Sequence, residues 1–474
     1  MNLPVFPLAV PRRLLVTLKL GEVPEHLPSV LACKRYGVRR ADKIDRGTLD
    51  RVLRHFGGAA RSARLHNSRL RASQKPGVSG ARRFDQTEQL SGVARVIRVE
   101  LQNDVNLSEL SDALAQVPVV ERVQMDRLCG TPFDSPVEQI AAAQIDQDQA
   151  WRSRQLVRLP QALGFEPGDP AVVMGLADTG VVSSHLELSG NIRRGFDSVD
   201  LNQAMVGDLE LVGDNQIKDE LPFDEVGHGT ACASILSARG VQLPPGGAGQ
   251  CGLTPVRVLG AGLVGQKRVG IGALSNIDVG MKRLIDLGVK VINMSFGTAK
   301  SDLASDAPLP HQEVVDYALA REVILVAAGG NSGLAESYYP AAHTGVIAVG
   351  AVDDFAKPCR FSTRGEHIAL SAPGKKIWSA GLNDYQQVTG TSFAAPFVAA
   401  VCTLMAAHAR RRALPLRVSL VKEILIRSTR PFSTAGVEGF GAGVLDGLAA
   451  LQLLSRSLDD MNYQAGADYV AANG

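Results

Sequence analysis

The chain has 474 residues, of which 45 % are hydrophobic, and a formal net charge of +2 at pH 7. This length can bury a full core and leaves room for more than one domain. We identify no apolar run of membrane-spanning length, so we expect a soluble protein without a membrane partner.

The N-terminus predicts no secretory signal, because the apolar residues 3–10 are interrupted by prolines and precede Arg12 and Arg13. We therefore expect a cytoplasmic protein, with export by a route not visible in the sequence as the alternative. The six cysteines are widely and irregularly spaced, unlike a disulfide framework or a Cys-x-x-Cys metal motif. We expect reduced, mostly buried thiols.

The near-neutral total hides two parts of opposite sign. Residues 1–100 carry 20 Lys and Arg against 8 Asp and Glu, a net charge of +12, which leaves −10 for residues 101–474. Opposite charges favour docking of the two parts on each other. Nucleic-acid binding by the basic part is not expected, because its arginines lie among few aromatics and in no nucleic-acid motif.

The first 130 residues predict a small basic α+β domain. Apolar periodicity gives strands at 14–20, 60–65, 94–101 and 119–125, helices at 49–56 and 107–116, and a long loop at 66–92. The order β-α-β-β-α-β is that of a ferredoxin-like fold. Gly and Pro recur at residues 129–136, so we assign residues 131–138 to a linker and processing region.

From residue 139 to 455 strands alternate with helices. Nearly continuous apolar strands are predicted at 171–177, 254–259, 289–294, 323–327, 345–349 and 368–371, with helices at 271–287 and 312–321. This pattern predicts an α/β domain with a parallel sheet flanked by helices, and functional groups at the carboxyl ends of its strands. Residues 456–474 are assigned to a polar C-terminal tail.

Four polar residues lie at such strand ends or at turns. Asp178 closes the first strand, His228 lies between glycines before an apolar segment, and Asn331 follows another strand. Ser392 precedes the apolar residues 393–401, which predict a buried helix. An acid, an imidazole, an amide and a hydroxyl are the groups that nucleophilic acyl transfer needs.

Each of these residues also has a purely structural alternative. Ser392 suits a helix N-cap, His228 a helix cap or a core position, and Asn331 a left-handed turn. Asp178-Thr179-Gly180 occurs in aspartic proteases, but those need a second copy, which this chain lacks. In this order and on this α/β pattern, we interpret the four residues as one site.

The chain resembles the subtilisin-like serine proteases, the subtilases, whose functional residues run Asp, His, Ser along the sequence. The resemblance covers about residues 140–450. It rests on segments that match the family's motifs, at 178–180, 227–230, 291–297, 328–333, 339–341, 361–365, 371–374 and 390–396.

The resemblance implies a role for each matching residue. Ser392 would be the nucleophile, His228 the general base and acid, Asp178 its orienting carboxylate and Asn331 the oxyanion donor. The residues implied to bind substrate are Ser295, Phe296, Gly297, Ala328 and Gly330.

The same resemblance gives the N-terminal domain a role as a ferredoxin-like prosegment that assists folding and inhibits with its C-terminal tail. An accessory domain that is never removed is the alternative. No metal ligands are assigned, and calcium is left open because no compact Asp/Asn ligand loop is evident.

Cys232 lies four residues after His228, one helical turn along the same face. This spacing is similar to that of a thiol-bearing, proteinase K-like subgroup of the family, so a mercurial is predicted to inactivate the enzyme. A small buried residue is the alternative.

We therefore expect a serine endopeptidase that acts on protein or peptide substrates and is partnered by its own prosegment. The rival interpretation is a catalytically silent pseudoprotease that binds peptides or regulates. Cleavage specificity, prosegment removal and oligomeric state are not determined by the sequence.

Overall fold

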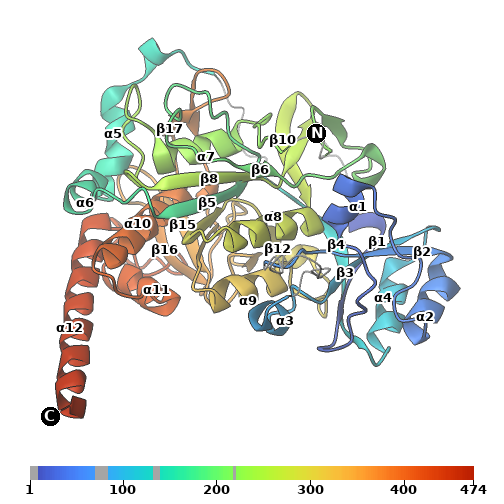
Figure 1. Ribbon diagram of the computed structural model, residues 1–474. Coiled ribbons are helices and arrows are strands. Elements are labelled where there is room, and N and C mark those ends of the chain that lie inside the picture. The colour runs from blue at the N-terminus through green and yellow to red at the C-terminus, as the bar shows by residue number, and fades with distance from the viewer. Residues whose placement is uncertain (1–8, 70–83, 132–138, 217–219, 474) are drawn as a thin grey trace.

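A parallel sheet of seven strands lies at the centre of the larger part of the molecule (Figure 1). The computed structural model describes residues 9–69, 84–131, 139–216 and 220–473. Nearly every strand residue is buried, as a sheet covered on both faces requires. This confirms the predicted α/β class. In sheet order the strands are β16 (Ile368–Pro373), β15 (Ile347–Val352), β13 (Ile324–Ala328), β11 (Val291–Met294), β5 (Val173–Asp178), β8 (Gly252–Arg257) and β6 (Phe196–Asp197).

Helices cover both faces of this sheet. α7 (His228–Ser237) and α10 (Thr391–Arg411) pack on one face, and α8 (Leu274–Asp286) and α9 (Gln312–Ala320) pack on the other. Each face has its own buried apolar cluster. Four more helices lie around the α10 side: α5 (Gln147–Leu156), α6 (Leu159–Phe165), α11 (Val418–Arg427) and α12 (Gly447–Asn473).

The helix predicted at 271–287 begins later than expected. Lys267–Ala273 form strand β10, and α8 starts only at Leu274. β10 pairs antiparallel with β9 (Gly260–Val264), because small and apolar residues alternate along it with the period of a strand. The short remaining elements are β7 (Glu210–Val212), β12 (Thr298–Ala299), β14 (Tyr338–Tyr339), β17 (Ile377–Ala380), β18 (Tyr385–Val388) and the 3₁₀ turns at Ala142–Gln144, Gln203–Met205 and Lys300–Asp302.

The N-terminal part has an antiparallel sheet in the order β2-β3-β1-β4. One face buries an apolar cluster under helices α2 and α4, and the other face packs against α8 of the larger part. Its elements are β1 (Ala9–Leu18), α1 (Val30–Tyr36), α2 (Thr48–Gly57), β2 (Ala60–Arg64), α3 (Gln86–Leu90), β3 (Val96–Leu101), α4 (Leu107–Ala115) and β4 (Val120–Gly130).

Two elements of this part were not predicted. The region 66–92, expected as a loop, contains α3, which begins at a capping box formed by Asp85 and Glu88. Residues 70–83 of that region lie outside the described residues. Helix α1 begins where Ser29 accepts a hydrogen bond from the Ala32 amide.

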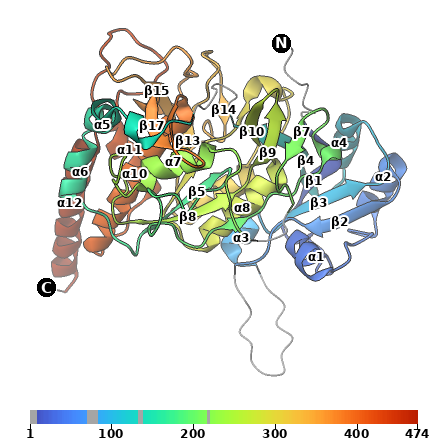
Figure 2. The same ribbon diagram turned by 90° about the horizontal axis from the view of Figure 1, so that it is seen from above.

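Strand β4 joins the two parts. Its C-terminal residues pair antiparallel with β10, so the strands β2-β3-β1-β4-β10-β9-β7 form one continuous sheet. Figure 2 shows the N-terminal part at one end of the molecule, beside α8 and β10. β4 is thus longer than the predicted strand at 119–125 and extends to Gly130.

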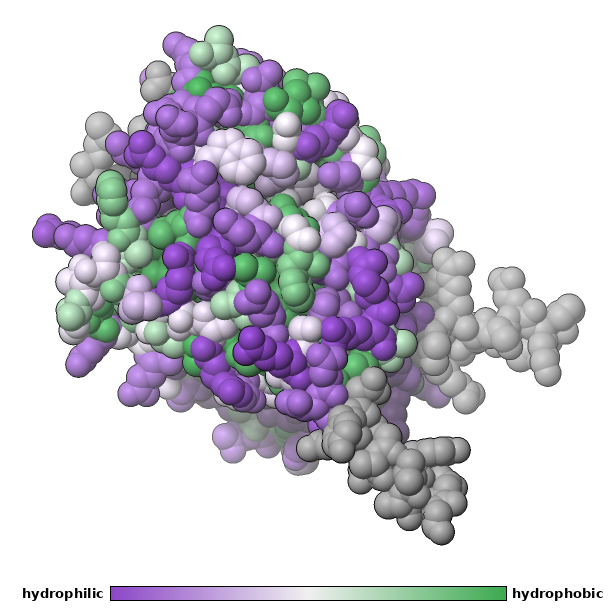
Figure 3. Space-filling view, turned by 90° about the vertical axis from the view of Figure 1, so that its left-hand side faces the viewer, coloured by the Kyte–Doolittle hydropathy of each residue, from purple (hydrophilic) through white to green (hydrophobic). Residues whose placement is uncertain are grey.

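One described helix, α10, is long and apolar enough to span a membrane, contrary to our sequence-based expectation, and its apolar window is buried throughout within the protein. Burial of this kind is typical of a core helix. The face shown in Figure 3 carries apolar groups in small patches among hydrophilic side chains. Residues 456–473, assigned to a polar tail, continue the helix α12.

Candidate active site

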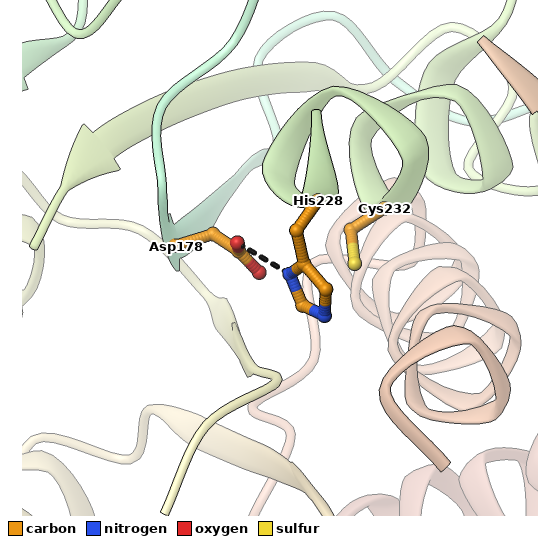
Figure 4. A group of neighbouring side chains, drawn as sticks. All are labelled: Asp178, His228 and Cys232. Atoms are coloured by element: carbon orange, nitrogen blue, oxygen red, sulfur yellow. Dashed lines mark hydrogen bonds and ion pairs between the residues drawn. The ribbon is translucent and has the colours of Figure 1, made fainter. Parts of the chain in front are cut away.

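Asp178 and His228 meet at the carboxyl edge of the parallel sheet (Figure 4). Asp178 is the last residue of β5, and His228 is the first of α7, after Gly227 in a left-handed conformation. Nδ1 of His228 and Oδ1 of Asp178 are 2.7 Å apart. The same carboxylate oxygen accepts the Thr179 amide at 2.8 Å. The two residues predicted from separate motifs therefore form one hydrogen-bonded pair.

Asp224 holds this pair in place and was missed by the sequence analysis. Its fully buried carboxylate accepts the Thr179 hydroxyl at 2.8 Å, the Gly227 amide at 2.9 Å and the Thr230 amide at 2.8 Å. It thereby ties the end of β5 to the start of α7. Its position four residues before His228, in a loop with a glycine, is the signal that could have identified it as a cap.

The electrostatics of His228 are set by two opposing effects. Burial alone would lower the pKa of the imidazole, but the carboxylates of Asp178 and Asp224 outweigh it and raise the pKa above its ordinary value. Nε2 of His228 is buried and has no hydrogen-bond partner among the described residues. This nitrogen is therefore available to a substrate or a neighbouring hydroxyl.

Ser392 lies in the first turn of α10 and is 1 % exposed. Its carbonyl accepts hydrogen bonds from the Ser295 hydroxyl at 2.8 Å and from the Cys232 thiol at 3.4 Å. Its own hydroxyl donates to the Ser295 carbonyl at 3.3 Å. The next side chain, Phe393, has its ring centroid 5.1 Å from that of His228, so the start of α10 adjoins the Asp178–His228 pair.

Asn331 is fixed against the same helix start. Its Oδ1 accepts both the amide and the hydroxyl of Thr391 at 2.9 Å. These bonds direct the Nδ2 amide toward the turn before Ser392, where a Cβ added to Gly390 would be only 3.1 Å from Nδ2. Gly390 also has φ = +151°, so a side chain at this position would be strained. The amide donor of Asn331 thus lies beside the first turn of α10.

The other predicted substrate-binding residues line two neighbouring strand ends. Phe296 is buried, and Gly297 forms an antiparallel bridge with Gly130 of the N-terminal part. Ala328 ends β13, and Gly330 exchanges hydrogen bonds with the Thr391 hydroxyl at 3.2 Å. The nine predicted site residues therefore lie at the start of α10, at the end of β5 and the start of α7, or at and just beyond the carboxyl ends of β11 and β13.

Among the residues that the structure describes, one group of side chains is close enough to share a metal ion. It consists of Asp178, His228 and Cys232, with ligand atoms within 4.8 Å of one another. The Asp178–His228 hydrogen bond already engages two of these side chains. The Cys232 thiol is fully buried, and burial raises its pKa well above the ordinary value, so it is protonated.

Comparison with known proteins now places this geometry in a family. The model of the subtilase family matches residues 169–443, more than half of the chain. The chain belongs to the subtilase family. This subtilase is 32 % identical over 262 residues to thermitase of Thermoactinomyces vulgaris, with 54 % of this chain and 82 % of the relative covered.

Other similar proteins support membership of the same family. Subtilisin DY of Bacillus licheniformis is 32 % identical over 254 residues, covering 52 % of this chain and 79 % of the relative. Among solved structures, the prenylagaramide maturation protease PagA aligns with a TM-score of 0.50 at 25 % identity, over 62 % of this chain and 98 % of that one. This subtilase is a subtilisin-like serine endopeptidase, and its substrates are peptides or proteins.

The position of Cys232 leads to a first prediction. Mercuric ion should inactivate the subtilase over minutes, because metal on this buried thiol would displace the Ser392 carbonyl that it contacts. The Cys232→Ala variant should remain active and resist the ion, whereas a Cys251→Ala control should stay sensitive. Peptidase activity against time after addition of HgCl₂ measures this, and full activity of stoichiometrically mercurated enzyme would contradict it.

Proposed function

We propose that Ser392, His228 and Asp178 form the catalytic triad of this serine peptidase. The observation that carries the proposal is the 2.7 Å hydrogen bond between Asp178 and His228 beside the first turn of α10. In this role His228 takes the proton of Ser392 as the hydroxyl attacks the peptide carbonyl, then gives it to the leaving amine. Water hydrolyses the acyl-enzyme by the same steps in reverse.

Two further groups support the attack. The Nδ2 amide of Asn331 and the backbone N–H groups at the start of α10 would donate to the oxyanion that forms on the carbonyl. Thr391 orients Asn331 through its other amide atom, which favours a donor that is already in position before the reaction.

We further propose that residues 1–130 are a ferredoxin-like prosegment that assists folding and inhibits the enzyme. The strand order β2-β3-β1-β4, with all neighbours antiparallel, supports the fold. Its last strand runs into the substrate cleft, where Cys129 pairs with Gly272 and Gly130 bridges to Gly297. Thr131 also donates its amide to the Gly270 carbonyl at 3.0 Å. The tail thus occupies the backbone positions that a bound peptide would take.

Buried side-chain contacts also join the two parts and support docking of the proposed prosegment. Asp126 of β4 is fully buried and accepts the Ser275 amide at 2.9 Å and the Ser275 hydroxyl at 2.7 Å. It therefore caps α8, whose own preceding residue, Ala273, has no side-chain acceptor. Arg122 of β4 also pairs with Glu313 of α9 at 3.0 Å.

Loss of the nucleophile is the direct test. Wild-type protein should cleave itself between Thr131 and Gln139 and react with a fluorophosphonate probe, whereas Ser392→Ala should stay intact and unlabelled. A Ser184→Ala variant, altered at an exposed serine, should behave like wild type. Intact mass spectrometry measures both effects. If the fluorophosphonate does not label the wild type, the proposed triad is wrong and the pseudoprotease interpretation is favoured.

The raised pKa of His228 predicts a pH dependence. The general base must be neutral, so activity should fall as the pH drops through a pKa above 6.5. Asp178→Asn removes the carboxylate that raises this pKa, so the acidic limb should move to lower pH. We expect kcat to fall about 10⁴-fold in the same variant, since the imidazole loses its orienting group. Profiles of kcat/KM against pH check this, and an unmoved limb would contradict it.

The Asp126 cap predicts a defect in inhibition. Asp126→Asn leaves Arg13 without one of its acidic partners and weakens the cap of α8, so the cleaved prosegment should bind about 10- to 100-fold more weakly. The lag before peptidase activity appears should shorten accordingly. Asp104→Asn, altered at a carboxylate whose side chain is 88 % exposed, is the matched control. Equal lags in the two variants would exclude this role.

A further inference from the structure

A cavity of about 510 Å³ lies between the N-terminal part and the larger part of the molecule. The N-terminal part contributes the start of β1, the start of β2 and the end of β3, which lie side by side. The larger part contributes the 3₁₀ turn at Gln203–Met205 and Asn202, the residue before it. The described lining includes no residue of the active site. A cavity of this size can hold a small molecule.

Three arginines and one carboxylate line this cavity. Arg13 on β1 and Arg61 on β2 both lie directly opposite Glu100 on β3, so the three side chains share one face of the sheet. Arg12 is the third arginine. Neighbours in a strand normally point to opposite faces, but β1 is irregular here and Arg12 has φ = +58°, so Arg12 and Arg13 both reach the cavity. Three arginines against one glutamate leave an excess of two positive charges.

Glu100 cannot neutralise all of these cations. Its carboxylate forms ion pairs with Arg13 at 3.3 Å, with Arg98 at 3.3 Å and with Arg40. Arg61 has no hydrogen bond or ion pair to a residue that the structure describes. Its guanidinium is therefore free to bind an anion in the cavity.

The ion pairs that surround the cavity do not remove the excess of positive charge. They add three carboxylates, those of Asp104, Asp126 and Asp200. They also add three cations, those of Lys34, Arg40 and Arg98. Burial and the nearby Arg13 lower the pKa of Arg98 to about 10, so like charges repel one another within this network. An added anion would relieve this repulsion.

We propose that this cavity binds a small molecule that carries phosphate groups. A guanidinium matches the oxygens of a phosphate group with two parallel hydrogen bonds. A phosphate group carries a charge of about −1.5 to −2 at pH 7, which matches the excess of two positive charges.

Two side-chain amides complete the set of donors. Asn202 and Gln102 both line the cavity. Oε1 of Gln102 already accepts the Ala59 amide at 3.4 Å, so its Nε2 remains a donor for the ligand. Because Asn202 belongs to the larger part and the arginines belong to the N-terminal part, a bound ligand contacts both parts.

This geometry makes the ligand a regulator of docking. A molecule that binds only when the two parts are in contact stabilises the docked state by mass action. It should therefore keep the N-terminal part bound for longer and delay the onset of peptidase activity. This consequence rests on the proposed prosegment role, whereas binding to the cavity does not.

The first test titrates phosphate compounds into the full-length Ser392→Ala chain, in which the two parts stay covalently joined. Orthophosphate and tripolyphosphate should each bind to one saturable site with a Kd below about 1 mM at constant ionic strength, as measured by calorimetry. Tighter binding of tripolyphosphate indicates a ligand with a phosphate chain, and equal affinity indicates free phosphate. If neither compound shows saturable binding, the proposal is overturned.

The second test removes a cation from the cavity. Arg61 is exposed and has no described partner, so Arg61→Gln should fold normally and bind both compounds about tenfold more weakly or worse. Arg54→Gln removes the same charge from an exposed position of α2 outside the cavity. This control should stay within about twofold of the parent, because exposed charges at a distance are screened by salt. Equal affinities of the two variants would overturn the proposal.

The third test alters the cavity from the larger part. Asn202→Asp replaces an exposed amide with a carboxylate that repels the ligand, so binding should weaken about tenfold. Gln144→Glu makes the same change of charge at an exposed position of the larger part outside the cavity and should have no such effect. An unchanged affinity in Asn202→Asp would show that the ligand does not contact both parts.

The wild-type protein tests the regulatory consequence. Saturating tripolyphosphate should lengthen the lag before peptidase activity about threefold or more, and Arg61→Gln should show no such lengthening. An unchanged lag in the wild type would overturn the regulatory role. If no activity appears and the fluorophosphonate does not label Ser392, the proposed function fails instead. Calorimetry of the uncleaved chain then still decides whether the cavity binds phosphate.

Discussion

The site depends on one hydrogen bond, between the buried carboxylate of Asp178 and the imidazole of His228. A carboxylate at this depth is tolerable only with partners, and here the partners are His228 and the Thr179 amide. The sheet places Asp178 at the end of a central strand, and α7 can present His228 to it only because Asp224 ties the two segments together. The start of α10 then brings a hydroxyl beside the pair. The positions of the backbone elements and the need of the buried carboxylates for partners thus favour the same placement of Asp178, His228 and Ser392.

The interface between the two parts also depends on buried charged side chains that have partners. Ion pairs cross it in both directions, Arg122 with Glu313 and Lys282 with Glu88, and the side chains of Lys282 and Glu88 are only 3 % and 0 % exposed. Buried pairs of this kind add modestly to stability but are costly to break singly, because one charge then stays without a partner. The interface is therefore specific to one docked geometry. The overall charge split only brings the two parts together.

Much of this arrangement can be predicted from the sequence, since local patterns determine it. Apolar runs indicate the parallel strands, and short glycine-flanked motifs indicate Asp178, His228 and Ser392. What the sequence could not supply depends on contacts between distant segments. Residues 267–273 carry a strand pattern and pair with the adjacent β9, but their second partner is β4, about 140 residues earlier. The role of Asp126 depends on its contact with Ser275, and that of His311 on its contact with Asp278, which lie far away in the sequence. The sequence predicts α10 as a buried helix, whereas its full length, which would suffice to span a membrane, and its complete burial are seen only in the structure.

The continuity of β4 with β10 has a consequence for timing. Scission of the chain after Thr131 would break none of the described backbone hydrogen bonds between β4 and β10, because all of these lie on the N-terminal side of the cut. The new C-terminus would stay bound like an unreleased product. Its release would require β4 to separate from β10 in the middle of a continuous sheet. Under the proposed prosegment role, bond breakage and the onset of activity are separate events. If residues 1–130 act as the proposed inhibitory prosegment, the delay before activity would be set by release of this strand, and the cleaved enzyme would be inactive in that interval.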